Sequence, residues 1–256
     1  MTVTANRPRA RSVYEPEHEA FRESFRRFLD TEVVPGYENW EREGGRIPRE
    51  LFRKAGSHGF LGMSVDEEFG GGGTDDFRFN AVIAEEVADA GVMSFGVNLH
   101  NDICVPYFER YADDEQKRRW LPGLASGDLI AAIAMTEPGT GSDLAGITTT
   151  AKEEGDHFVL NGSKTFISNG INADLVIVAA RTESGGDRHG GLSLLVVERD
   201  TPWLPAWAQS GEDRHACAGH RRVVLRGRPG PPGGGTCWVS EVEAFVHSSP
   251  TSLRSG

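Results

Sequence analysis

The sequence predicts an α+β protein, in which an all-helical domain is followed by a small β-barrel-like domain and an irregular tail. Apolar residues recur at helical spacing up to about residue 128, the spacing becomes that of strands up to about residue 200, and regular patterning then disappears. We therefore expect a disordered N-terminal tail at 1–14, a helical domain at 15–130, an incomplete β-domain at 131–201 and an irregular tail at 202–256.

The helical domain is predicted from apolar stripes and from residues that start or stop helices. Four helices are expected in chain order: one around residues 21–29, one over 48–59 with Pro48 at its first position, one after an N-cap at Thr74, and one over 114–124. Gly59 and Gly91 are placed where helices end. The core-facing residues of the first, third and last helices are Phe21, Phe25, Phe28 and Leu29, then Phe79, Val82, Ile83 and Val87, then Trp120, Leu121 and Leu124.

Two polar or glycine-rich stretches interrupt this helical part. The run FGGGGT, residues 69–74, is interpreted as a flexible connector before a helix, because it follows no strand and so has a weak claim on phosphate. His100, Asn101 and Asp102 lie between apolar segments. A hydrogen-bonded core cluster is at least as good an explanation of these three residues as a ligand site.

The β-domain is predicted from short apolar runs bounded by turn residues. Residues 174–180 (DLVIVAA) and 191–197 (GLSLLVV) are typical of buried strands, with a polar loop between them at 182–190. Asn161-Gly162 is a strong hairpin signal between two β-rich runs. After Thr201 the chain is rich in proline and glycine and lacks Lys, Asn, Ile, Met and Tyr, which predicts neither helix nor strand.

Composition limits the possible partners and compartments. The 256 residues carry a formal net charge of −11, which argues against nucleic acid or an anionic membrane surface as a partner. Cys104, Cys217 and Cys237 show no paired spacing, and Cys217 with His220 is only a fragment of a zinc site, so no metal is expected. No apolar run approaches the roughly 20 residues that span a bilayer. We expect a cytoplasmic protein, and we interpret its arginine-bearing start as a tail rather than an organellar presequence.

The stretch AMTEPGTGSDLAG, residues 134–146, follows the apolar run LIAAIAM and has the residue types of an anion-binding turn. Gly139 and Gly141 fit the first two glycines of a dinucleotide fingerprint, but Leu144 takes the place of the third, and the β-prone ITTT follows instead of a helix. The stretch is therefore predicted to be an anion-cradling loop between two strands. An ordinary hairpin connection is the alternative.

The order of these features resembles the acyl-CoA dehydrogenase family. Helices carrying DEEFGGGG come first, MTEPGTGSD follows them, and NGSKTFISNG precedes the last strands. The resemblance covers roughly Glu15 to Thr201 and is closest to the branch that acts on longer or branched acyl chains. It implies a helical domain packed on a small β-domain, with FAD bound between that β-domain and a C-terminal helical bundle.

The resemblance also implies a set of cofactor-binding residues. Backbone N–H groups near Gly141 and Ser142 would hold the FAD pyrophosphate, and Ser142 would also approach the acyl-CoA substrate. Thr136 would meet the polar edge of the isoalloxazine, next to Ile133 and Met135. Phe166 takes the position of an aromatic residue, commonly Trp, that lies against one flavin face, and Ser168 that of a hydroxyl near flavin N5. Lys164 is expected to be a structural or surface-pairing residue.

The reaction implied is α,β-dehydrogenation of an acyl-CoA thioester. A glutamate removes the α-proton, the flavin accepts the β-hydride, and hydrogen bonds to the thioester carbonyl stabilise the developing enolate. The family's glutamate lies in the C-terminal bundle, and residues after Thr201 show no helical pattern that could carry it. We therefore assign no catalytic residue and expect a reading-frame shift near Pro202. We also expect weak or absent FAD retention, poor solubility and no turnover by this chain alone.

The resemblance implies electron-transfer flavoprotein as the partner that removes the electrons, and a homo-oligomer only in the full-length form. Two other classes of function stay open. One is a non-catalytic fragment or an FAD- or acyl-CoA-binding module. The other is an acyl-CoA oxidase or a flavin monooxygenase, since relatives with those activities share the fold.

Overall fold

The computed structural model describes residues 13–44, 46–154, 157–182, 191–199 and 242–244. The predicted polar loop at 182–190 lies outside these residues except for Thr182. Cys217, Cys237 and His220 also lie outside them, as does nearly all of the two predicted tails. Within the predicted C-terminal tail, Val242–Ala244 form a short strand, β6.

The helical domain is built from helices whose apolar stripes face the core. In the described residues its α-helices are α1 (Pro16–Phe28), α2 (Val34–Arg42), α3 (Glu50–Ser57), α4 (Arg78–Asp89), α5 (Val105–Tyr111) and α6 (Asp114–Ser126). Two π-helical turns, η1 (Leu29–Val33) and η4 (Leu99–Cys104), run directly into α2 and α5, and short 3₁₀ turns occur at Glu67–Phe69 and Met93–Phe95.

The core residues that the stripes predict are buried, except Phe21 and Phe79, which are partly buried and pack against the core. Phe25, Phe28 and Leu29 pack with residues of α3 and α4 in one cluster, and Trp120, Leu121 and Leu124 of α6 lie in a second cluster. Gly59 and Gly91 have positive φ angles and follow the ends of α3 and α4, which confirms their predicted role as helix stops. Helix α3 begins at Glu50 with Arg49 as its N-cap, so the prediction that Pro48 is its first residue is wrong.

Two further local predictions in this domain are wrong. Thr74 does not cap α4, which begins at Arg78; the Asp76 carboxylate instead accepts from the Arg78 N–H at 3.0 Å. The glycine run is a packed loop and not a flexible connector, because its N–H groups donate to carbonyls of residues 62–67. A Cβ on Gly71 would lie 2.1 Å from the Val65 carbonyl oxygen, so the glycine permits this close approach.

The β-domain is a curled sheet in which the central strand is buried on both faces. Its strands are β1 (Ala131–Ala134), β2 (Thr150–Glu154), β3 (His157–Asn161), β4 (Leu175–Arg181) and β5 (Leu192–Glu198). The order is β3-β2-β4-β5-β6, and β1 pairs in parallel with the first half of β4. The continuous apolar run of β4 and the run of β5 confirm the two predicted strands.

The Asn161-Gly162 pair does not form the hairpin turn that its sequence predicts. Strands β2 and β3 form the hairpin, with Glu154 opposite His157, and Asn161 is the last residue of β3. Gly162 has another role, because a Cβ at this position would lie 2.2 Å from the Thr149 Oγ1. The glycine lets the chain after β3 pass directly over the end of the β1–β2 loop.

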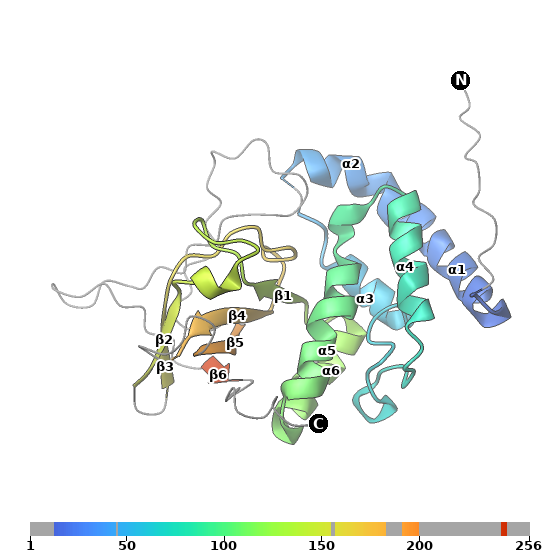
Figure 1. The fold of residues 1–256 in the computed structure, drawn as a ribbon. Helices are drawn as coiled ribbons and strands as arrows, with labels where there is room; N and C mark the ends of the chain where they lie inside the picture. Colours follow the sequence, from blue (N-terminus) through green and yellow to red (C-terminus); the bar gives the residue numbers. More distant parts are fainter. Residues whose placement is uncertain (1–12, 45, 155–156, 183–190, 200–241, 245–256) are drawn as a thin grey trace.

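The helical and β-domains share one of the hydrophobic core clusters. Strand β4 turns Leu175 and Ile177 toward α5 and α6, and turns Val176 and Val178 to the opposite face of the sheet. Figure 1 shows α5 and α6 between the sheet and α4, with α1 on the far side. Within the described residues, no helix combines the length and apolar character needed to cross a bilayer.

Candidate functional site

Two loops of the β-domain carry the predicted site residues. The first loop runs from Met135 to Thr149 between β1 and β2, and the second runs from Gly162 to Asp174 between β3 and β4. The Thr165 N–H donates to the Thr136 carbonyl at 2.8 Å, and the Lys164 ammonium donates to the Met135 carbonyl at 3.0 Å. Met135 and Thr136 therefore lie beside the segment that carries Phe166 and Ser168.

A buried carboxylate, Glu137, joins both loops. Its Oε2 accepts from the N–H and hydroxyl of Thr148 at 2.8 and 2.6 Å, and its Oε1 accepts from the N–H and hydroxyl of Thr149 at 2.9 and 2.5 Å. The Lys164 Nζ completes the set at 3.0 Å from Oε1. The side chains of Glu137 and Lys164 are almost fully buried, so this is an internal ion pair. Of the two roles expected for Lys164, structural or surface-pairing, the structure shows the structural one, because its ion pair is buried.

The hydrogen bonds to Glu137 decide its protonation state. Burial by itself would raise the pKa of Glu137, but the donors of Thr148 and Thr149 outweigh it and lower that pKa to about 2. Burial lowers the pKa of Lys164 from its ordinary value, and the neighbouring carboxylate opposes this change. Glu137 is thus an anion at neutral pH, and it is a poor proton acceptor.

The predicted anion-binding turn is held from both sides and open on its outer face. Glu137 and Thr140 exchange backbone hydrogen bonds at 2.8 and 3.1 Å, and the Thr140 hydroxyl donates to the Gly146 carbonyl at 2.9 Å. Gly141 and Ser142 are exposed, and no described residue accepts from their N–H groups. These two adjacent donors fit an anion.

The sequence suggests that Gly141 is a glycine because the turn needs a positive φ, but the structure gives a different reason. Gly141 does not have a positive φ, unlike nine other glycines of the described chain. A Cβ at this position would meet nothing within 4 Å. The chain itself therefore leaves open space beside this backbone, as a bound phosphate would require.

Phe166 combines two unfavourable features. Its φ is +56°, in the left-handed region, and its side chain is 63% exposed. Asn169, three residues later, has φ +61°, and within the described chain these are the two non-glycine residues with positive φ. Strained backbone of this kind persists where surrounding contacts hold it and is concentrated at functional sites.

Neighbouring contacts explain how this strained segment is held. The Asn169 amide donates to the Gly96 carbonyl at 2.9 Å and to the Ala131 carbonyl at 3.4 Å, which ties the loop to the helical domain and to β1. Ile133 lies on β1 and is partly buried, and Ser168 is also partly buried. The structure therefore brings Met135, Thr136 and the 166–168 segment together, with Gly141 and Ser142 farther along the first loop.

Sequence reasoning missed Glu137 as a site residue and did not identify it as the partner of Lys164. The available signal was that Glu137 is the only carboxylate between residues 129 and 142. Its donors Thr148 and Thr149 are eleven and twelve residues away, and Lys164 is still farther. Their convergence depends on the loop geometry, which no local pattern encodes.

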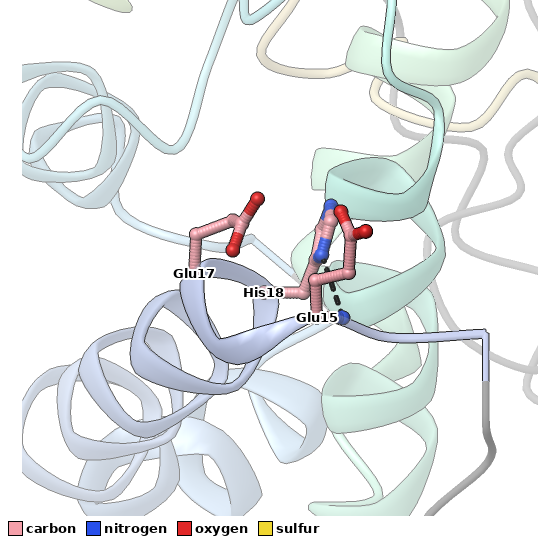
Figure 2. A group of neighbouring side chains, drawn as sticks. All are labelled: Glu15, Glu17 and His18. Atoms are coloured by element: carbon pink, nitrogen blue, oxygen red, sulfur yellow. Dashed lines mark hydrogen bonds between the residues drawn. The ribbon is translucent and has the colours of Figure 1, made fainter.

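A group of possible metal ligands occurs at the start of α1, far from these loops in the chain. The ligand-type atoms of Glu15, Glu17 and His18 lie within 4.8 Å of one another (Figure 2). His18 is fully buried; its Nδ1 accepts from the Glu15 N–H at 3.1 Å, and its Nε2 lies 3.1 Å from Asp76 Oδ2. Both ring nitrogens are hydrogen-bonded within the protein, so the group forms a helix cap.

Comparison with known proteins identifies relatives of both domains. The family model described as "Acyl-CoA dehydrogenase, N-terminal domain" matches residues 15–128, and the model "Acyl-CoA dehydrogenase, middle domain" matches residues 132–222. The mitochondrial long-chain specific acyl-CoA dehydrogenase of Sus scrofa is 45% identical over 190 residues, which are 73% of this chain and 44% of that protein.

Solved structures give the same result. The crystal structure of an acyl-CoA dehydrogenase from Geobacillus kaustophilus is 51% identical, has a TM-score of 0.71, and matches over 75% of this chain and 50% of that one. An acyl-CoA dehydrogenase complexed with FAD from Bacillus anthracis is 34% identical, with a TM-score of 0.67, over 75% of this chain and 32% of that one. The chain thus spans about half the length, or less, of these relatives.

Proposed function

Because this chain belongs to the acyl-CoA dehydrogenase family, we propose that it supplies the part of an FAD-dependent acyl-CoA dehydrogenase that holds one side of the flavin. The observation that carries this proposal is the pairing of the two loops, in which the Thr165 N–H and the Lys164 ammonium bind the Thr136 and Met135 carbonyls. This pairing places an exposed, strained aromatic residue, Phe166, beside the Met135–Thr136 backbone.

The residues present fit FAD. The open N–H groups of Gly141 and Ser142 would receive the pyrophosphate, and the space beside Gly141 would accept it without displacing a side chain. The Phe166 ring would lie against the isoalloxazine, with Thr136 at its polar edge and Ile133 and Met135 in the adjoining wall. Ser142 would also contact the acyl-CoA.

The proposed reaction is α,β-dehydrogenation of a fatty or branched acyl-CoA thioester. FAD, when bound, accepts the hydride that leaves the β-carbon. The contribution of this chain is orientation: the Ser168 hydroxyl would lie near flavin N5, and Phe166 would fix the ring plane. Electron-transfer flavoprotein is the proposed acceptor of the electrons.

We propose that this chain alone does not turn over acyl-CoA. Glu137 is the carboxylate at the start of the first loop, but it is buried and accepts hydrogen bonds from Thr148, Thr149 and Lys164. With a pKa lowered to about 2, mainly by hydrogen bonds that outweigh its burial, it would not remove an α-proton at neutral pH. The chain would then act as a flavin- and substrate-binding unit.

Titration with FAD tests the proposal. Flavin fluorescence should show saturable one-to-one binding, and Thr136→Ala and Ser168→Ala should each raise the dissociation constant about five- to tenfold, the effect of losing roughly one hydrogen bond. Thr31→Ala is the matched control, because the Thr31 hydroxyl donates to the Arg27 carbonyl in the helical domain. It should leave binding unchanged.

Two results would count against this function. Non-saturable binding, or equal binding by all three variants, would contradict the flavin site. Bleaching of the bound flavin when a fatty acyl-CoA is added would contradict the proposed lack of turnover and would show that the chain supplies a base of its own.

A further inference from the structure

We propose that Lys164 and Glu137 are positioning residues for the flavin: the Lys164 ammonium fixes and polarises the Met135–Thr136 peptide, whose N–H then donates to the polar edge of the isoalloxazine. This inference rests on the proposed function, since it needs a flavin beside Thr136. It assigns a role to a buried ion pair that the sequence did not predict.

The first support is geometric. The Lys164 Nζ lies 3.0 Å from the Met135 carbonyl oxygen and 3.0 Å from Glu137 Oε1, so one ammonium holds two groups of the same loop. The next residue, Thr165, donates its N–H to the Thr136 carbonyl at 2.8 Å. The peptide groups on both sides of the Thr136 Cα are therefore held by consecutive residues of the second loop.

The second support is that Glu137 does not need Lys164 as a hydrogen-bond donor. Four donors from Thr148 and Thr149 already hydrogen-bond both carboxylate oxygens. Lys164 is therefore not needed to satisfy this carboxylate's hydrogen bonds. Burying an ammonium is costly, and apolar residues often stabilise such positions better than an ion pair does. The contact of Lys164 that the threonines cannot replace is the one with the Met135 carbonyl.

The third support is electrostatic. A cation that binds a peptide carbonyl withdraws charge from it and strengthens hydrogen bonding by the N–H of the same peptide, by about 10–30% per bond. For Met135 that N–H belongs to Thr136, and no described residue accepts from it. Its donor strength is thus available to a ligand. Donation to the flavin's polar edge should favour reduced FAD, which carries more negative charge there.

The experiment compares this chain with its Lys164→Met variant and with the double variant Glu137→Gln/Lys164→Met. The single variant leaves Glu137 as a buried charge and should unfold at a lower urea concentration, whereas the double variant removes both charges and should regain part of that loss. Both variants should bind oxidised FAD at least about tenfold more weakly. The affinity for reduced FAD should fall about tenfold further than that for oxidised FAD, which corresponds to a fall of about 30 mV in the midpoint potential of the bound flavin.

Glu86→Gln is the matched control. Glu86 is also buried and accepts from Arg22 and Arg26, but it lies in the helical domain. This variant should lower stability without changing the midpoint potential or the FAD dissociation constant. It separates a loss of stability from a loss of positioning.

The outcomes distinguish this inference from the proposed function. If the unchanged chain binds no FAD, the proposed function and the inference both fail. If the unchanged chain binds FAD and the double variant keeps its affinity and midpoint potential, the inference alone fails. If the ion pair had only a structural role, FAD binding and stability would both recover in the double variant, and the inference alone would fail.

Discussion

Phe166 shows most directly how a single residue is held in an unfavourable state. A left-handed backbone costs a residue with a side chain about 1 kcal/mol or more, and this ring also has little burial to offset that cost, since it is 63% exposed. The contacts on either side, from Thr165 to Thr136 and from Asn169 to Gly96, keep the segment in place. Because the ring is mostly exposed, its burial offsets little of the backbone cost.

Replacing Phe166 should therefore separate stability from binding. Phe166→Gly removes the left-handed strain but gains entropy in the unfolded chain, so its free energy of unfolding should stay within about 1 kcal/mol of the unchanged chain or rise. Its FAD affinity should fall about five- to tenfold with the loss of ring stacking. Phe166→Trp should keep the affinity. Urea unfolding and flavin titration measure the two quantities, and a strongly destabilised glycine variant would contradict the strain argument.

At the scale of elements, the two loops of the β-domain show that glycines serve different physical ends: Gly162 begins the β3–β4 loop, and Gly141 lies in the β1–β2 loop. Gly162 permits close packing, because a Cβ there would overlap the Thr149 side chain, and Thr149 is one of the donors to Glu137. Gly141 has open space beside it and no left-handed φ. The first glycine is needed by the fold, whereas under the proposed function the second leaves room for the FAD pyrophosphate.

Two alanine substitutions test this difference. Gly162→Ala should destabilise the protein by about 1–3 kcal/mol, because the methyl group displaces Thr149 and disturbs the Glu137 hydrogen bonds. Gly141→Ala should leave the free energy of unfolding within about 0.5 kcal/mol but weaken FAD binding. Urea denaturation with and without FAD would reveal both effects. Equal stability of the two variants would refute the packing role of Gly162.

At the scale of the whole molecule, polar contacts fix the helical domain against the sheet. Arg49 of the helical domain binds Asp174 at 2.7 Å and also contacts the Asn172 carbonyl, while Trp120 donates to Glu198 at 3.2 Å. At the centre of this junction, His100 is fully buried; its Nε2 donates to the Leu124 carbonyl at 2.9 Å and its Nδ1 accepts from the Ala131 N–H at 3.2 Å. His100 thus links α6 to β1.

The junction should respond to acid through His100. Burial lowers the pKa of His100 from 6.5 to about 4, although its hydrogen bond to Leu124 opposes the shift. The unfolded chain protonates His100 more readily than the folded chain does. The contribution of neutral His100 to stability is therefore complete above the unfolded pKa and is lost as pH falls from about 6.5 toward 4. Between pH 7 and pH 5 we expect a loss of about 2 kcal/mol from this group.

Comparison with a His100→Asn variant isolates this contribution. Burial raises the pKa values of Asp102 and Glu109, so their protonation opposes the effect of His100 as pH falls, but both carboxylates are present in both chains. The difference in unfolding free energy between the two chains should therefore shrink by about 2 kcal/mol from pH 7 to pH 5. A difference that does not depend on pH would show that His100 does not titrate in this range.

Much of the fold was predictable because its signals are local. Helical stripes such as Phe25–Leu29, the helix stops at Gly59 and Gly91, and the apolar runs of β4 and β5 depend on spacing within one segment, and burial confirms them. Turn chemistry was less reliable. The sequence predicts a flexible run at 69–74 and a turn at Gly162. In the structure, glycines such as Gly71 and Gly162 are needed for close packing, because backbone or a side chain from another segment lies against them.

The sequence by itself determined the family and the order of the two domains. It also supplied the candidate flavin residues between Ile133 and Ser168, whose roles stay predictions. The tertiary structure alone decided that Glu137, Thr148, Thr149 and Lys164 form one buried network beneath these residues, and that His100 joins the domains. The physical reason is that a buried charge requires partners from several segments. Such partners are brought together by packing, and no single stretch of sequence records their distances.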